Sequence, residues 1–166
     1  MNKFTSLWIS VLILSILALP ASASQKAELN LWKFDEFLSG ACGFCGDFVA
    51  FHEGKDLSSF TDFARYLQSG YYTAVLTGPK ETTITLFGAM DVATDRGFLI
   101  ITKRDDALVE IEDLEAFTPD TWVHVAARDG SSGAFSAYYH PHPLFKNNIA
   151  SGKWGTWQPA PTPRNE

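Results

Sequence analysis

Alternation of apolar and polar residues in the second half of the 166-residue chain constrains its fold more than any other feature. Strict alternation puts successive side chains on opposite faces of an extended strand, which is typical of antiparallel sheets with one buried face. Short links rich in turn residues separate these runs, and they favour hairpins because a parallel pair needs a crossover of about a dozen residues. The pattern predicts six strands, at residues 71–77, 82–88, 97–103, 108–114, 122–128 and 134–140.

A helical spacing precedes these strands. Apolar residues recur every three or four positions between Leu57 and Gln68, and Gly70 follows, as glycine commonly does just past a helix C-terminus. We therefore expect an α+β fold that is mainly antiparallel β. One helix, at about residues 57–69, would pack against a curved meander of about six strands over residues 71–140. A β-sandwich is the alternative.

Segments outside this region carry weaker patterns. Residues 27–38 are expected to form a short helix or an edge strand, and residues 47–52 a short strand. Residues 149–157 are a candidate for a final strand.

The N-terminus has the features of a cleavable export signal. Lys3 supplies a positive charge, residues 7–19 are apolar, and Ala21-Ser22-Ala23 matches the small-residue pattern that signal peptidase accepts. The apolar run is shorter than the ~18 residues that suggest a membrane-spanning helix. We expect a secreted or periplasmic protein without a membrane span, comprising a signal peptide (1–23), one globular β-rich domain (24–157) and a flexible proline-rich tail (158–166).

The charge balance argues against one class of partner. The chain carries 13 Lys and Arg against 19 Asp and Glu, for a net charge of −6 at pH 7. A nucleic-acid-binding protein needs a basic patch that neutralises phosphates, and the basic residues here are scattered. Nucleic acid is therefore not an expected partner.

Cys42 and Cys45 form a CxxC pair in a glycine-rich loop. In an oxidising compartment the simplest prediction is a structural disulfide between them. The same spacing permits thiol–disulfide exchange, although a strand-like sequence follows where a redox motif normally has a helix. His140 and His142 are two residues apart on a predicted strand and, with the cysteines, could complete a Cys2His2 zinc site as an alternative. No other metal and no cofactor is predicted.

Aromatic residues form 14% of the chain and give the main argument for binding. Neighbouring residues on a strand face opposite sides, so one member of each adjacent tyrosine pair is expected to be exposed. Exposed Tyr and Trp rings combine apolar area with a polar tip, which suits sugars, peptides and proteins. The candidate ligand-binding residues are Tyr72, Tyr139, Trp154 and Trp157.

No coherent catalytic set is visible, and no catalytic residue is predicted. The sequence lacks a GxSxG motif. Glu110 and Glu112 share one face of a predicted strand, but acids alternating with apolar residues are typical of a solvated sheet face.

Residues 122–126 (WVHVA), followed by Asp129-Gly130, resemble a strand-and-turn phrase of laminin-G-like, concanavalin-type sandwiches. The resemblance covers about a dozen residues and implies a carbohydrate or protein binder. The predicted helix at residues 57–69 departs from that pattern.

Three functions follow from these observations. The first is an exported, non-catalytic binding domain that presents a curved sheet or its loops to a small ligand, glycan or partner protein. The second is a periplasmic thiol/disulfide or metal-handling protein acting through Cys42 and Cys45. The third is a structural subunit of an envelope or secreted assembly, docked through residues 154–163.

Overall fold

The computed structural model describes residues 26–34, 46–59, 71–145 and 148–157. Mainly antiparallel β structure is confirmed in these ranges, and helix is limited to one 3-10 turn, η1 (Met90–Val92). The strands are β1 (Glu28–Phe34), β2 (Gly46–His52), β3 (Tyr71–Leu76), β4 (Thr83–Phe87), β5 (Phe98–Lys103), β6 (Val109–Ile111), β7 (Trp122–Val125), β8 (Phe135–His140) and β9 (Ser151–Trp154).

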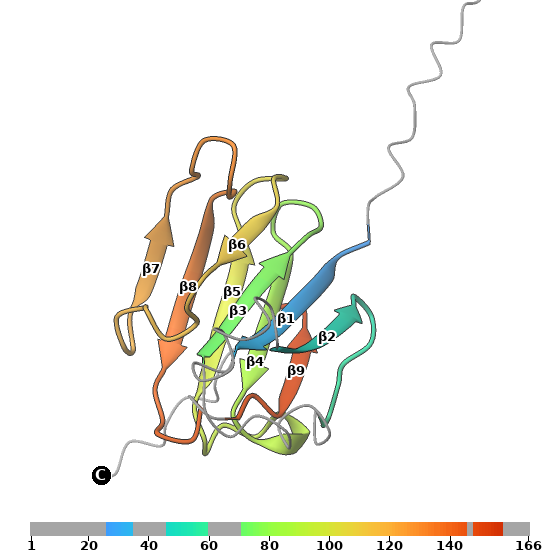
Figure 1. The fold of residues 1–166 in the computed structure, drawn as a ribbon, viewed down its shortest axis with the longest axis vertical. Helices are drawn as coiled ribbons and strands as arrows, with labels where there is room; N and C mark the ends of the chain where they lie inside the picture. Colours follow the sequence, from blue (N-terminus) through green and yellow to red (C-terminus); the bar gives the residue numbers. More distant parts are fainter. Residues whose placement is uncertain (1–25, 35–45, 60–70, 146–147, 158–166) are drawn as a thin grey trace, which may run out of the picture.

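The strands form two sheets, and all the pairings within them are antiparallel. A four-stranded sheet has the order β2-β1-β3-β6, and a five-stranded sheet has the order β7-β8-β5-β4-β9. Figure 1 shows the first sheet lying over the second, with β7 at one side and β2 and β9 at the other.

One apolar core joins the two sheets. Every second residue of the central strands points into it, so Leu29 and Leu31 of β1 belong to the same buried cluster as Leu99 and Ile101 of β5. Strand alternation explains this arrangement because it gives each sheet one apolar face, and the two faces cover each other. A two-sheet structure with a shared core agrees with the alternative expectation of a sandwich.

The expected single meander does not form. All six predicted runs contain a strand, but β3 pairs with β1 and β6, whereas β4 pairs with β5 and β9. The link between β3 and β4 is a corner between sheets: Glu81 N donates to Lys103 O (3.1 Å), and Lys103 N donates to Thr82 O (2.9 Å). The backbone groups next to the turn are thus satisfied by β5, so a short link did not produce a hairpin.

The predicted helix at residues 57–69 falls largely outside the described residues. Its first residue, Leu57, is not helical: it makes an isolated antiparallel bridge with Gly152, with N···O distances of 3.0 and 2.9 Å. The segment at residues 27–38 is a strand in its described part, and β1 is an inner strand rather than an edge, because it pairs with both β2 and β3.

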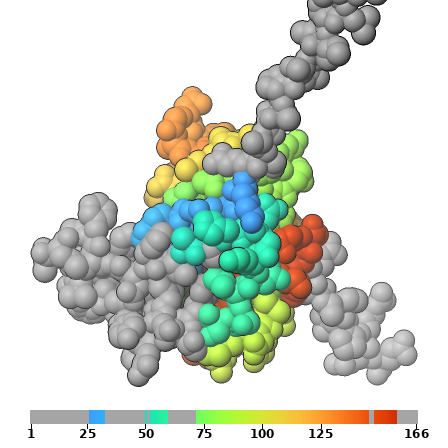
Figure 2. Space-filling model, turned by 90° about the vertical axis from the view of Figure 1, so that its right-hand side faces the viewer, coloured from blue at the N-terminus to red at the C-terminus, as the bar shows by residue number. Residues whose placement is uncertain are grey.

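The two open sides of the sheet pair differ. On one side, residues 53–57 continue from β2 to β9, where Asp56 Oδ1 accepts a hydrogen bond from Trp154 N (2.8 Å). Figure 2 views this side and shows β2 and the segment after it beside β9. On the other side, the edge strands are β6 and β7. A hollow lies between these two edge strands.

Within the described ranges, no helix is long and apolar enough to cross a membrane. The predicted signal peptide (1–23) and tail (158–166) lie outside these ranges and stay predictions.

Candidate functional site

An aromatic row crosses the outer face of the five-stranded sheet. Here the residues that alternate with the core residues are aromatic on four neighbouring strands, and a tryptophan after β9 packs on two of them. Their ring centroids are 5.0–6.4 Å apart, within the usual range for aromatic pairs. We call this set the aromatic strip: Trp122 (β7), Tyr138 (β8), Phe98 (β5), Phe87 (β4) and Trp157.

Exposure rises along the strip toward its β7 end. Phe87 and Phe98 are buried, with Trp157 packed edge-on against both at 5.1 and 5.0 Å. Trp122 is 48% exposed, and its ring lies 5.5 Å from the half-buried ring of Tyr138 at an angle of 53°. Trp157 is half-buried like Tyr138, and the most exposed ring of the strip is that of Trp122 beside Tyr138.

Polar groups flank this exposed end. Asp120, in the loop before β7, places Oδ1 2.6 Å from His140 Nδ1 and 3.5 Å from the Tyr138 hydroxyl. Its backbone has a left-handed φ of 54°, and its N–H donates to Tyr139 O (2.8 Å). Asp and Asn tolerate this conformation better than most residues, so the loop geometry suits the residue that supplies the carboxylate.

The pKa of Tyr138 is raised. Desolvation by burial is the main cause, and the Asp120 carboxylate adds to it by its charge and by accepting the hydroxyl hydrogen bond. Tyr138 therefore stays a neutral hydroxyl that can donate a hydrogen bond across the physiological pH range. The exposed end thus offers an indole ring, a phenol, a carboxylate and an imidazole.

A contact between a histidine and a serine lies farther along the same face. His124 Nδ1 is 2.8 Å from Ser136 Oγ, because the two residues are direct cross-strand partners in β7 and β8. Ser136 is only 3% exposed, so its hydroxyl is not presented to a substrate as a nucleophile would be. The contact is better suited to holding the two strands together.

Of the four predicted ligand-binding residues, three lie in the core and one lies on the outer face of the five-stranded sheet. Tyr72 (3% exposed), Tyr139 (4%) and Trp154 (9%) are part of the core between the sheets. Trp157 packs on the outer face and belongs to the aromatic strip. The structure thus brings only one of the four to the surface described above.

The expectation that one of Tyr138 and Tyr139 faces outward agrees with the structure, but the outward residue is Tyr138. The inward Tyr139 contacts Phe145 at 5.5 Å and donates its hydroxyl hydrogen bond to Glu115 (3.1 Å). Burial is the main cause that raises the Tyr139 pKa, and the charge of Glu115 adds to it. Alternation identifies a pair with opposite faces, and these long-range contacts decide which member is buried.

The histidines of the alternative zinc site already have partners on one nitrogen. His140 Nδ1 contacts Asp120, and His142 Nδ1 accepts a hydrogen bond from Leu144 N (3.1 Å). In the described part of the chain, no three His, Cys, Asp or Glu residues form a metal-binding group. Cys42 and Cys45 lie outside that part, so their disulfide and their metal or redox roles stay predictions.

Comparison with known proteins gives no family. No protein-family model, curated protein or solved structure matches the chain.

Proposed function

We propose that this protein is an exported, non-catalytic binding domain whose ligand is a glycan that contacts the exposed end of the aromatic strip. One observation carries the proposal: the 48% exposed Trp122 ring lies beside Tyr138, at the end of the strip that the Asp120–His140 pair flanks.

Sugar chemistry fits this combination. A pyranose has an apolar face of C–H groups, which covers a flat aromatic ring, and a rim of hydroxyl groups that need hydrogen-bond partners. The Trp122 indole offers the flat area, and the Asp120 carboxylate and the His140 imidazole offer acceptors and donors at its side. Trp122, Tyr138 and His140 lie on sheet strands, and the loop residue Asp120 contacts two of them. Side chains held in this way lower the entropic cost of binding.

Two further features support an exported binding role. The N-terminal sequence has the pattern of an export signal. In the described residues, the one serine–histidine contact on this face has its hydroxyl buried. The first feature supports export, and the second argues against Ser136 as a nucleophile on this face.

The test is a binding screen of the exported chain against an array of glycans, followed by calorimetric titration of a glycan that binds. Trp122→Ala should weaken binding at least tenfold, because exposed tryptophans often dominate the energy of such interfaces. Leu108→Ala is the matched control: Leu108 is 44% exposed and precedes β6, at the edge of the other sheet. Equal affinities of the two variants would contradict the proposal.

A further inference from the structure

An open hollow of about 250 Å³ lies on the side of the molecule where β6 and β7 are the edge strands. The opposite side is spanned by residues 53–57, which connect β2 to β9. The polar residues that line the hollow are Glu110, Glu112, Asp113 and Arg128.

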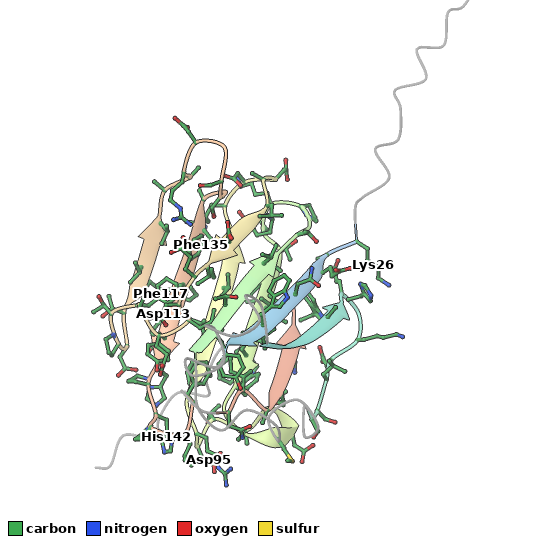
Figure 3. All side chains as sticks on the ribbon, in the orientation of Figure 1. Lys26, Asp95, Asp113, Phe117, Phe135 and His142 are labelled. Atoms are coloured by element: carbon green, nitrogen blue, oxygen red, sulfur yellow. The ribbon has the colours of Figure 1, made fainter. Side chains whose placement is uncertain are left out.

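The deeper part of the hollow is apolar. Phe135 is buried in the core, and the half-buried Phe117 and Val125 pack against that core. The rings of Phe117 and Phe135 meet edge to face, with centroids 6.0 Å apart and planes at 88°. Figure 3 labels both rings, with Asp113 close to Phe117. A ligand in this hollow would therefore meet the half-buried Phe117 ring, with the buried Phe135 ring packed edge to face behind it.

The rim is acidic. Among the described residues that line it, three are carboxylates and one is a cation, Arg128. Arg128 Nη1 lies 3.3 Å from Glu112 Oε1, and both side chains are largely exposed. Asp113 Oδ1 already accepts a hydrogen bond from Glu115 N (2.8 Å). The hollow thus combines an apolar floor with an excess of negative charge.

We propose that this hollow binds a small organic cation of the quaternary ammonium class. The methyl groups of such a cation cover an apolar floor, its charge is attracted to aromatic rings, and it needs no hydrogen-bond acceptor in a fixed direction. That last property matters because part of the rim's acceptor capacity is already used by Arg128 and Glu115 N. The proposal concerns a different surface from the aromatic strip and does not depend on the glycan.

Arg128 should oppose the binding of a cation in the hollow. As a cation on the rim, it repels an incoming cation and neutralises part of the acidic field. Removing its charge should therefore tighten binding, whereas removing a rim carboxylate should weaken it. An exposed pair changes affinity by up to about 1 kcal/mol, so each effect should be about fivefold or less.

The test is an NMR titration of the full exported chain with choline and with its neutral carbon isostere, 3,3-dimethylbutan-1-ol. Choline should shift signals of Phe117 and Val125 and should bind more tightly than the isostere. Phosphocholine should bind more weakly than choline because its phosphate meets the acidic rim. Glu110→Gln should weaken choline binding, and Arg128→Gln should strengthen it.

Two control variants separate this site from others. Asp95→Asn removes an exposed acid that Figure 3 shows far from Phe117, and it should leave choline affinity unchanged. Trp122→Ala should also leave it unchanged, which keeps this test independent of the glycan proposal. Equal binding of choline and the isostere, no binding at tens of millimolar, or weaker binding by Arg128→Gln would each overturn the proposal.

Discussion

Asp120 Oδ1 lies 2.6 Å from His140 Nδ1, joining the loop before β7 to the end of β8. The two residues are twenty positions apart in the sequence. Their contact holds the carboxylate against the sheet face that carries Trp122 and Tyr138. The same aspartate also contacts the Tyr138 hydroxyl, so one loop residue links both polar side chains at the exposed end of the aromatic strip.

Replacement of Asp120 should reveal how much the left-handed backbone conformation at this position matters for stability. Asp120→Asn should keep the unfolding free energy within about 0.5 kcal/mol of wild type, because Asn tolerates the φ of 54°. Asp120→Val should cost about 1–3 kcal/mol, since a β-branched residue is strained in that conformation. Urea unfolding followed by circular dichroism measures both. Equal stabilities of the two variants would show that the loop does not hold this backbone geometry.

Gly78 should be intolerant of a side chain at the corner between the sheets. It has a φ of 112°, and a Cβ there would lie 2.6 Å from Ala27 Cβ and 2.9 Å from Ala27 Cα. Gly78→Ala should therefore lower the unfolding free energy by about 2 kcal/mol or more. Gly130→Ala is the control, because Gly130 also has a positive φ (72°) but has nothing within 4 Å of the added carbon. Its cost should be only about 1 kcal/mol of strain. Thermal melts of the two variants give the comparison.

Lys103 should make stability depend on pH in the alkaline range. Its side chain is fully buried, it donates to Ala107 O, and desolvation lowers its pKa below the usual 10.5, opposed by the charges of Asp105 and Asp106. Between the lowered pKa and 10.5 the unfolded state binds more protons than the folded state, so the unfolding free energy should rise with pH. Lys103→Met should abolish this rise. A rise of equal size in the variant would assign it to another group.

The raised pKa of Tyr72 should make the unfolding free energy fall with pH above pH 10. Burial raises its pKa from 10.0 to about 12, and the hydrogen bond from Ile149 N only partly offsets this. Above pH 10 the unfolded state loses the phenol proton first, so up to roughly 2–3 kcal/mol of stability should be lost between pH 10 and 12. Tyr72→Phe should lose less over the same interval. Urea unfolding at pH 9, 10 and 11 measures the difference, and parallel curves for the two proteins would refute it.

The strands could be predicted from local sequence because alternation is a local property. All six predicted runs between residues 71 and 140 contain a strand, and the candidate run at 149–157 contains β9. The assignment of each strand to a sheet could not be predicted in this way. β3 pairs with β1, which lies about forty residues earlier, and β4 pairs with β9, which lies more than sixty residues later.

The functional surface was predictable only in part. Alternation indicates that Tyr138 and Tyr139 face opposite sides, but the choice depends on the partners of Tyr139, which are Phe145 and Glu115. Nothing in the sequence indicates that Asp120 contacts His140, because Asp120 lies in a loop and the contact depends on the position of β8. The placement of Asp120 between a proline and a short strand-like run is a weak hint of a fixed turn.

The hollow between β6 and β7 could also be predicted only in part. Its residues come from β6, β7, β8 and the loops that follow β6 and β7, and they meet because β6 and β7 are edge strands on the same side of the two sheets. The sequence shows Glu110 and Glu112 as an acidic strand face, which agrees with their exposure. It cannot show that Phe117 and Phe135 lie behind them, because that depends on how the sheets stack.

The proposed ligand, a glycan, contacts the exposed end of the aromatic strip. The most direct measurement is a ¹⁵N–¹H NMR titration of the protein with a glycan from the array screen. We expect the Trp122 indole N–H signal to shift together with the backbone signals of Asp120, Tyr138 and His140. All four signals should saturate with the same dissociation constant. If the glycan binds and shifts other signals while these four stay unchanged, the proposed binding surface is wrong.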